Sequence, residues 1–506
     1  MNSYKGILEA MAIQIPETFG IELNQVIQQH STNPVLYRAV TESIIWRTNS
    51  SITDNTKRVI RAYFSTPLDI EEAMNRNDAL LSVSTRVGNL LNIKWTHNIY
   101  VSTPMPERDS ILQPIWHSSF GKLGVFDRLL RWALKADIKN INAKSAELWT
   151  MQLLWFCVAS DRRVRDYATK GIVRIMDRHA HLWPTIINQF PEIDDDYVLE
   201  RSFATAYGSL IRTMNHEIIR KTAKLIIEVF FDTGNLPVNA LIRDYLRCIL
   251  ELASEHGLLS KNRNIKEFRP PYKSTWPLNW PKKEEIEKFK DSYKELPKLY
   301  QSVFEDDFEK YIVGRRFNNY EEFNKDDALR WIFKHVLEMG YSSILHVNFD
   351  RYILGKYGHG RSKPEWAERV GKKYQWIALY RLIGYISDNA KPSPSRWDSP
   401  ASIIPPFIAI DKRNIDPTHF IKELEDTDIS QWWMQVNYDF GKFTDLSDEE
   451  WLDMDNDFPK DQKLLKVVQP ELRGESWIIL NNYITWRTKK EEQDNDHDFD
   501  KPFREF

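Results

Sequence analysis

The chain has 506 residues, of which 42% are hydrophobic and 28% charged, a balance typical of globular proteins rather than disordered ones. Lys and Arg total 69 against 72 Asp and Glu, so the chain as a whole lacks the basic excess usual in duplex-binding domains. Its two cysteines, Cys157 and Cys248, lie within apolar helical patterns and provide no disulfide framework, which predicts buried thiols and a reducing, cytoplasmic location. The first nine residues lack a secretion-signal layout, and no stretch has the apolar length of a membrane span.

Residues 1–140 are predicted to form an N-terminal helical segment interrupted by prolines. Apolar periodicity indicates a helix, a break at Pro16 and a second helix over 8–27, and a further helix over 125–134. The pattern that starts at Asp78 fits either a helix or a strand. Residues 103–113 are predicted to be a turn-rich link.

The clearest helical pattern covers 145–256, within a segment of HEAT-like helical repeats predicted at 141–260. Three stretches, near Asp161, Asp196 and Ala240, place a cap-like start before an Arg. An Asp before a helix accepts hydrogen bonds from its free amides, and the Arg can bond to the neighbouring unit. An ordinary helical domain without repeats is the alternative. The apolar runs are Leu148, Met151, Trp155 and Val158; Val164, Tyr167, Ala168, Gly171, Ile172 and Ile175; Leu199, Phe203, Tyr207 and Leu210; Ile219, Ala223, Ile226 and Phe230; and Leu241, Tyr245, Ile249 and Leu252.

The regular helical periodicity ends near residue 261, and the sequence beyond it is predicted to form three further segments. Residues 261–345 contain a Pro- and Trp-rich loop over 269–281, strapped to the body by its aromatic side chains, followed by helical patterns at 283–311 and 325–339. Residues 346–490 are predicted to be a mixed α/β segment, with a helix over 375–387 and a strand-like run over 476–486. Residues 491–506 form an acidic tail that is predicted to be disordered. The predicted fold class is therefore mainly α, a HEAT- or TPR-like helical repeat solenoid with a mixed α/β C-terminal part.

The sequence offers no motif for a catalytic centre. It contains no G-x-x-x-x-G-K-[ST] phosphate loop, no H-E-x-x-H metal motif and no G-x-S-x-G nucleophile turn. The acidic run Asp194, Asp195 and Asp196 is interpreted as negative charge at the start of a helix rather than as a cation site. We therefore predict a protein without enzymatic activity, metal or cofactor.

Two clusters are candidates for partner binding, because interface hot spots are enriched in Trp, Tyr and Arg. Each cluster has an alternative interpretation. For the first cluster the alternatives are helix–turn packing and a nucleic-acid contact. For the second cluster the alternative is core packing. The clusters are Arg162, Arg163 and Arg165, and Trp432, Trp433 and Tyr438.

Short motifs along residues 5–487 resemble, in their order, the region that follows the ATPase in Avs-type antiviral STAND NTPases of prokaryotes. Each motif alone is weak, and the order carries the resemblance. They are EAMAIQIPE (9–17), MPERD (105–109), SDRRVRDYATK (160–170), YVLER (197–201), AYG (206–208), LIRDY (241–245), RPPY (269–272), WP (276–277), KYQWI (373–377), GESW (474–477) and YITW (483–486).

This resemblance implies a helical sensor that recognises a phage protein of the terminase or portal class. The effector and P-loop ATPase of the family are absent from this chain, so any ATPase or nuclease activity would belong to a missing domain or to a separate STAND partner chain. The expected function is thus a protein-binding sensor in antiphage defence, with no membrane partner and with nucleic acid an unlikely one. The alternatives are a hydrolase or nuclease with an unrecognised site in 340–490, and a helical scaffold that binds nucleic acid.

Overall fold

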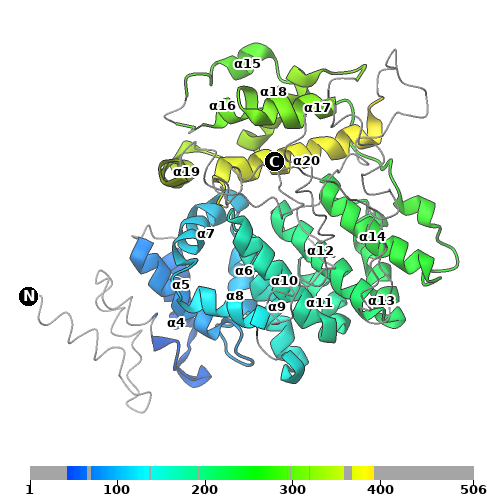
Figure 1. Ribbon diagram of the computed structural model, residues 1–506. Coiled ribbons are helices and arrows are strands. Elements are labelled where there is room, and N and C mark those ends of the chain that lie inside the picture. Colours follow the sequence, from blue (N-terminus) through cyan, green and yellow to red (C-terminus); the bar gives the residue numbers. More distant parts are fainter. Residues whose placement is uncertain are drawn as a thin grey trace, which may run out of the picture. The chain divides into compact units, whose positions relative to one another are not determined.

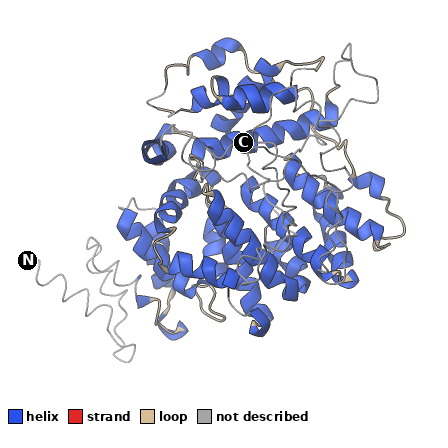
Figure 2. Ribbon diagram, viewed as in Figure 1, coloured by secondary structure: helices blue, strands red, loops and turns tan. Residues whose placement is uncertain are grey.

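The computed structural model describes residues 41, 43–64, 70–135, 138–190, 193–292, 295–296, 298–317, 320–357 and 367–391. These residues are mainly helical, as predicted, and no strand occurs among them (Figure 2). Within these ranges, Asp161 and Ala367 form an isolated antiparallel β-bridge. The predicted helices over 8–27, the strand-like run over 476–486 and the acidic tail lie outside the described residues. None of the described helices combines the length and apolar character needed to cross a membrane.

The N-terminal helices resolve one open alternative and correct one expectation. The ambiguous pattern around Asp78 is helical, and residues 105–119, predicted to begin in a turn-rich link, form a helix instead. Pro104 and Pro106 stand at the cap and in the first turn of that helix, where backbone amides have no intrahelical acceptor, so they start the helix rather than prevent it. These helices are α4 (Asp54–Phe64), α5 (Ile70–Ser84), α6 (Ile93–Ser102), α7 (Met105–Ser119) and α8 (Val125–Lys135).

Six further helices continue the array, and their alternate members lie side by side (Figure 1). Contacts join α8 to α10, α10 to α12 and α12 to α14, while α9 packs on α10 and α13 packs on α14. The helices are α9 (Ala143–Phe156), α10 (Arg162–His179), α11 (Trp183–Gln189), α12 (Asp196–Thr213), α13 (His216–Ile226) and α14 (Ala240–Glu255), with a π-helical turn at Ile227–Phe231.

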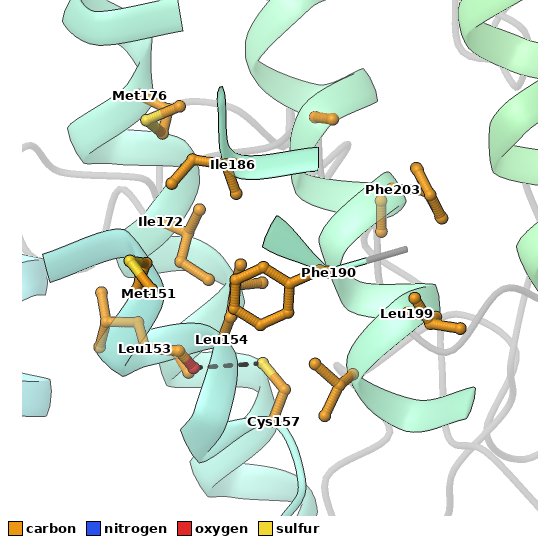
Figure 3. Packing of buried hydrophobic residues seen from close by; sticks show 14 of the residues in the cluster. Met151, Leu153, Leu154, Cys157, Ile172, Met176, Ile186, Phe190, Leu199 and Phe203 are labelled. Atoms are coloured by element: carbon orange, nitrogen blue, oxygen red, sulfur yellow. Dashed lines mark hydrogen bonds between the residues drawn. The ribbon is translucent and has the colours of Figure 1, made fainter. Parts of the chain in front are cut away.

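Most residues of the predicted apolar runs form the first hydrophobic core, but Tyr167 is 39% exposed, Tyr207 is only partly buried, and Leu241 is buried outside this core. Figure 3 shows Cys157 inside this core, where its Sγ donates to the carbonyl oxygen of Leu153 at 3.5 Å. Burial raises the pKa of the Cys157 thiol to about 12, so it is not a thiolate at neutral pH. Cys248 is buried as well, as predicted.

The same core holds a histidine that must stay neutral. Trp155 Nε1 donates to Nδ1 of the buried His97 at 3.1 Å, and the His97 ring packs on Phe190 with ring centroids 4.8 Å apart. Burial lowers the pKa of His97 to about 4. Since an unfolded histidine titrates near pH 6.5, the unfolded chain takes up the proton first as the pH falls.

We therefore expect that His97 makes no contribution to the pH dependence of the unfolding free energy above pH 6.5. Between pH 6.5 and pH 5, protonation of His97 in the unfolded chain should lower the unfolding free energy by about 2 kcal/mol. His97→Asn keeps an acceptor for Trp155 and removes the titration, so its unfolding free energy should depend less steeply on pH. Urea titrations of both proteins between pH 5 and 8 measure the difference. Equal slopes would show that His97 is not held neutral by the fold.

Helix caps in the array occur where the sequence placed them, with small shifts. Asp161 caps α10 and accepts from the amide of Arg163, and Asp195, one residue before the expected position, caps α12. Asn239 caps α14, which the sequence analysis did not assign. The Arg that follows a cap does reach the neighbouring helix in α12, because Arg201 pairs with Asp166 of α10 at 3.1 Å.

The loop over 269–282 is strapped to the body by its aromatic side chains, as predicted. Trp280 stacks on Phe323 with ring centroids 4.9 Å apart, and the Trp276 indole donates to Glu322 at 2.6 Å. The backbone amide of Tyr272 donates to Asp388 at 2.8 Å. The loop thus joins the end of the first array to the helices that follow.

A second hydrophobic core forms from these later helices. They are α15 (Lys283–Glu287), α16 (Leu299–Phe304), α17 (Gly314–Phe317), α18 (Lys325–Glu338), α19 (Ser343–Tyr357) and α20 (Val370–Asn389), with a π-helix at Phe308–Val313. The core also includes Met105, Tyr197 and Ala240, which stand in the first turns of α7, α12 and α14. The second core is therefore built on the N-terminal ends of helices of the first array, with α20 in contact with both α14 and α18 (Figure 1).

Candidate functional site

The three arginines predicted as a binding cluster have different environments. Arg162 is half-buried and pairs with Asp166 at 3.3 Å, and Arg163 is partly exposed and pairs with Asp161 at 2.7 Å. Arg165 is buried, donates to the carbonyl oxygen of Ala159 at 2.7 Å and lies over the Tyr197 ring. Arg165 therefore braces the start of α10 against α12 and takes no part in an exposed patch.

Arg163 belongs to a row of aromatic and basic side chains that spans three helices. Its guanidinium lies over the Phe120 ring, 4.7 Å from the centroid, and Phe120 contacts Tyr167 with centroids 6.2 Å apart. At the other end, the His117 ring meets Tyr352 edge-on at 5.8 Å. We name this row the α7–α10–α19 surface; it consists of His117, Phe120, Arg163, Tyr167, Tyr352 and Lys356.

Two members of this surface are exposed tyrosines, and its histidine is buried. Tyr352 is 50% exposed and Tyr167 39%. Lys356 Nζ lies 3.4 Å from His117 Nε2. Burial, followed by the charge of Lys356, lowers the pKa of His117 to about 4, so the imidazole can accept a hydrogen bond at neutral pH. The surface thus offers two exposed tyrosine rings beside the exposed Lys356, whereas Asp161 balances the charge of Arg163.

The turn between α9 and α10 connects this surface to the interior. Gln113 of α7 accepts from the amide of Ser160 and donates to the carbonyl oxygen of Val158, both at 2.7 Å. The carbonyl oxygen of Ser160 accepts from the amide of Glu368 at 3.2 Å. The backbone just before Arg163 is therefore held by α7 on one side and by the segment leading into α20 on the other.

Beneath the turn lies a buried ion-pair network centred on Lys373 of α20. Its ammonium donates to both carboxylate oxygens of Asp109 at 2.9 and 3.0 Å, and to Asp195 at 2.7 Å. All three side chains are fully buried. Burial raises the pKa of the Asp109 carboxyl, and the Lys373 ammonium opposes that shift. Lys373 therefore ties α7, α12 and α20 together at a single point.

The other two aspartates of the acidic run extend the network in both directions. Asp194 accepts from Arg108 and from the amide of Met105, each at 2.6 Å. Asp196 accepts two hydrogen bonds from the Arg381 guanidinium of α20, both at 2.8 Å, in a bidentate arrangement. The interpretation of this run as negative charge at a helix start is confirmed, but each carboxylate also binds a cation or an amide from another helix.

Two further buried carboxylates fix the ends of α20. Asp350 of α19 accepts from the amides of Val370 and Gly371 at 2.6 and 3.0 Å, which satisfies free donors at the start of α20. Asp388, near the other end, pairs with Arg243 of α14 at 2.8 Å. The helix is thus held by charged or polar contacts along its whole length.

Several carboxylates of the described residues lie close to one another or in a pocket. No group of three or more His, Cys, Asp or Glu side chains that could hold a metal ion occurs among the described residues. Between Asp109 and Asp195, the place a cation would take is filled by the Lys373 ammonium. A small pocket between α14 and α20 contains Asp244 and Asp388, but these carboxylates pair with Arg247 and Arg243.

The cations of this network were not predicted as site residues from the sequence, although a signal for them exists. Lys373, Arg381 and Asp388 lie at spacings of eight and seven residues in a long apolar helix, which places them on one face. Charged residues on one face of an otherwise buried helix indicate buried partners. The sequence alone does not identify which carboxylates those partners are.

The second predicted cluster, Trp432, Trp433 and Tyr438, lies outside the described residues. No protein-family model matches the chain, and no match was found among the curated proteins or the solved structures.

Proposed function

We propose that this chain is a protein-recognition module that contacts its target through the α7–α10–α19 surface. The observations that carry the proposal are two neighbouring contacts of exposed tyrosines: Tyr352 meets the His117 ring, and Tyr167 meets the Phe120 ring that Arg163 covers. Interface hot spots are enriched in tyrosine and arginine, because these side chains bury a large area and also hydrogen-bond. A rigid helical support keeps such a row ordered before binding, which lowers the entropic cost of association.

The ordered motifs that resemble Avs-type sensors support a more specific form of this proposal. In that form the target is a phage structural or packaging protein, the helical array is a HEAT-like solenoid, and the chain is a cytoplasmic, non-enzymatic sensor. An ATPase and effector would be supplied by a separate chain. The contacts of α8, α10, α12 and α14 in succession agree with stacked helical repeats.

Capture of phage proteins by the full chain tests the proposal. The immobilised chain is incubated with a panel of purified terminase, portal, capsid and tail proteins, and affinities are measured for each protein retained. We expect one structural or packaging class to bind. Tyr352→Ala should weaken that binding by about 2 kcal/mol, or roughly 30-fold, if Tyr352 is a central contact.

Tyr311→Ala is the matched control, because Tyr311 is 53% exposed on the helix Phe308–Val313 and lies outside the α7–α10–α19 surface. It should leave the affinity unchanged within a factor of two. Failure of the whole panel would contradict the phage-protein target. Equal losses from both tyrosine variants would contradict the assigned surface.

A further inference from the structure

The two large hydrophobic cores of the described structure do not merge. The first core draws its buried residues from 73–268, and the second draws all but three of its buried residues from 286–386. The three exceptions are Met105, Tyr197 and Ala240. One contiguous core is typical of each independently stabilised part of a protein. We call the helices α4 to α14 the first array, the helices α15 to α20 the α15–α20 unit, and the contact between the two the seam.

The seam is held by buried charges. Lys373 binds Asp109 and Asp195 across it, and Arg243 pairs with Asp388 across it at 2.8 Å. Among the ion pairs between described residues, the ones that are no longer than 2.9 Å and buried at both ends are these three. The tightest buried pairs in the described part of the chain therefore lie between the two cores and not within either of them.

Apolar contact across the seam is provided by the three exceptions and by the His117 ring, which meets Phe349 edge-on at 5.9 Å. Separation of the two sides would expose this apolar surface to water, which opposes separation. It would also return the buried charges to water and recover the free energy that their desolvation costs. A seam of this composition therefore opens at a lower cost than an apolar seam of the same area.

The path of the chain allows the α15–α20 unit to separate from the first array. The unit is one continuous stretch of sequence, and the loop over 269–282 connects it to α14. The Tyr272 ring contacts Phe231 of the first array with centroids 6.1 Å apart, whereas the Trp276 indole donates to Glu322 of the unit at 2.6 Å. Residues 273–275 thus lie between a part of the loop fixed to the array and a part fixed to the unit, which is where a hinge is expected.

We propose that the α15–α20 unit detaches from the first array as a whole, about a hinge at 273–275, while both cores stay folded. Detachment breaks the contacts of α20 with α7, α12 and α14 together. It also separates Tyr352 of α19 from His117 of α7. As a consequence that rests on the proposed function, the detached form lacks an intact α7–α10–α19 surface, so recognition is confined to the closed form.

Thiol labelling at a seam position of the full chain tests the proposal. Ser160 is 2% exposed, and its carbonyl oxygen accepts from the Glu368 amide across the seam. Cys157, three residues earlier, is fully buried in the first core. The protein with Ser160→Cys and Cys248→Ala carries both thiols, and fragment mass spectra after treatment with iodoacetamide assign the label to one or the other.

The seam thiol should be labelled roughly 100-fold faster than Cys157, because partial opening is more frequent than global unfolding. Rates in the urea-unfolded chain correct for the intrinsic reactivity of each thiol. Equal corrected rates for the two thiols would overturn the proposal.

A second pair of variants distinguishes detachment of the whole unit from local opening at Ser160. Arg381→Gln removes the bidentate contact with Asp196 and should speed labelling of the seam thiol roughly tenfold, because a charged hydrogen-bonded pair across the seam is lost. Arg212→Gln is the matched control: Arg212 pairs with Asp177 within the first array, and the rate should change by less than about twofold. An unchanged rate in Arg381→Gln would show that only the turn opens and would contradict detachment of the unit.

Hydrogen exchange gives a comparison that needs no substitution. The Glu368 amide donates across the seam to Ser160, whereas the Gly371 amide donates to Asp350 within the α15–α20 unit. Detachment therefore exposes the first amide and leaves the second protected, so Glu368 should exchange faster. Equal protection of these two amides would count against a detaching unit.

Discussion

Replacing Lys373 with methionine should lower the free energy of unfolding by about 3–5 kcal/mol, because it leaves Asp109 and Asp195 buried without their common cation. Methionine keeps the length and much of the volume of lysine, so packing changes little. The loss of unfolding free energy therefore measures the effect of leaving two buried carboxylates without their cation. Urea unfolding followed by tryptophan fluorescence measures it. The expected loss is a large fraction of the whole stability of a typical domain.

The neighbouring residue provides the control. Lys372 pairs with Glu368 at 3.5 Å and is partly exposed, so Lys372→Met should cost less than about 1 kcal/mol. Adding Asp109→Asn to Lys373→Met removes one of the stranded charges and should recover part of the loss. Similar unfolding free energies for the two methionine variants would show that the buried network does not hold α20 in place.

Gly384→Ala should have an effect of similar size, for a steric reason. A Cβ at this position of α20 would lie 1.7 Å from the carbonyl oxygen of Val238 and 2.8 Å from its carbonyl carbon. Backbone atoms cannot rotate away as a side chain can, so α20 must separate from the segment before α14. We expect a loss of about 3 kcal/mol or more in unfolding free energy.

Gly355→Ala is the matched substitution, because Gly355 is also helical and a Cβ there would meet no atom within 4 Å. It should stabilise the protein by about 0.5–1 kcal/mol through the higher helix propensity of alanine. Denaturant titrations of both variants give the comparison. Changes in unfolding free energy of equal size for the two variants, whatever their sign, would contradict the close approach of α20 to residue 238.

The sequence predicted local features of the fold better than contacts between distant segments. Helical periodicity identified the apolar faces of α9, α10, α12, α13 and α14, and the cap at Asp161 followed from its position before an apolar run. The start of helix α7 was missed because residues 103–113 were predicted to be a turn-rich link, although Pro104 and Pro106 both stand where a helix tolerates proline. Each correct inference rested on residues within about one helix of each other.

The candidate site depended on separations that no local pattern encodes. Lys373 and Asp109 are 264 residues apart in sequence, and only the folded chain brings them together. Arg165 looked like its neighbours Arg162 and Arg163 in sequence, yet one turn of helix was enough to bury it under Tyr197.

Contacts in the structure connect the α7–α10–α19 surface to helix α20 in the interior of the protein. Arg163 stands two residues after Asp161, which forms the β-bridge with Ala367, and the Val158 carbonyl of the same turn accepts from Lys373 at 3.3 Å. A target that presses on Arg163 and Tyr167 therefore acts on the backbone that positions α20. This route follows from contiguous contacts and requires no long-range motion.

Hydrogen–deuterium exchange of the full chain with and without a captured target tests the central claim, protein recognition by the α7–α10–α19 surface, most directly. The proposal predicts that bound target slows amide exchange at the end of α7, the start of α10 and along α19. Protection confined to other helices, such as α13 and α14, with unchanged exchange at these three places would contradict it.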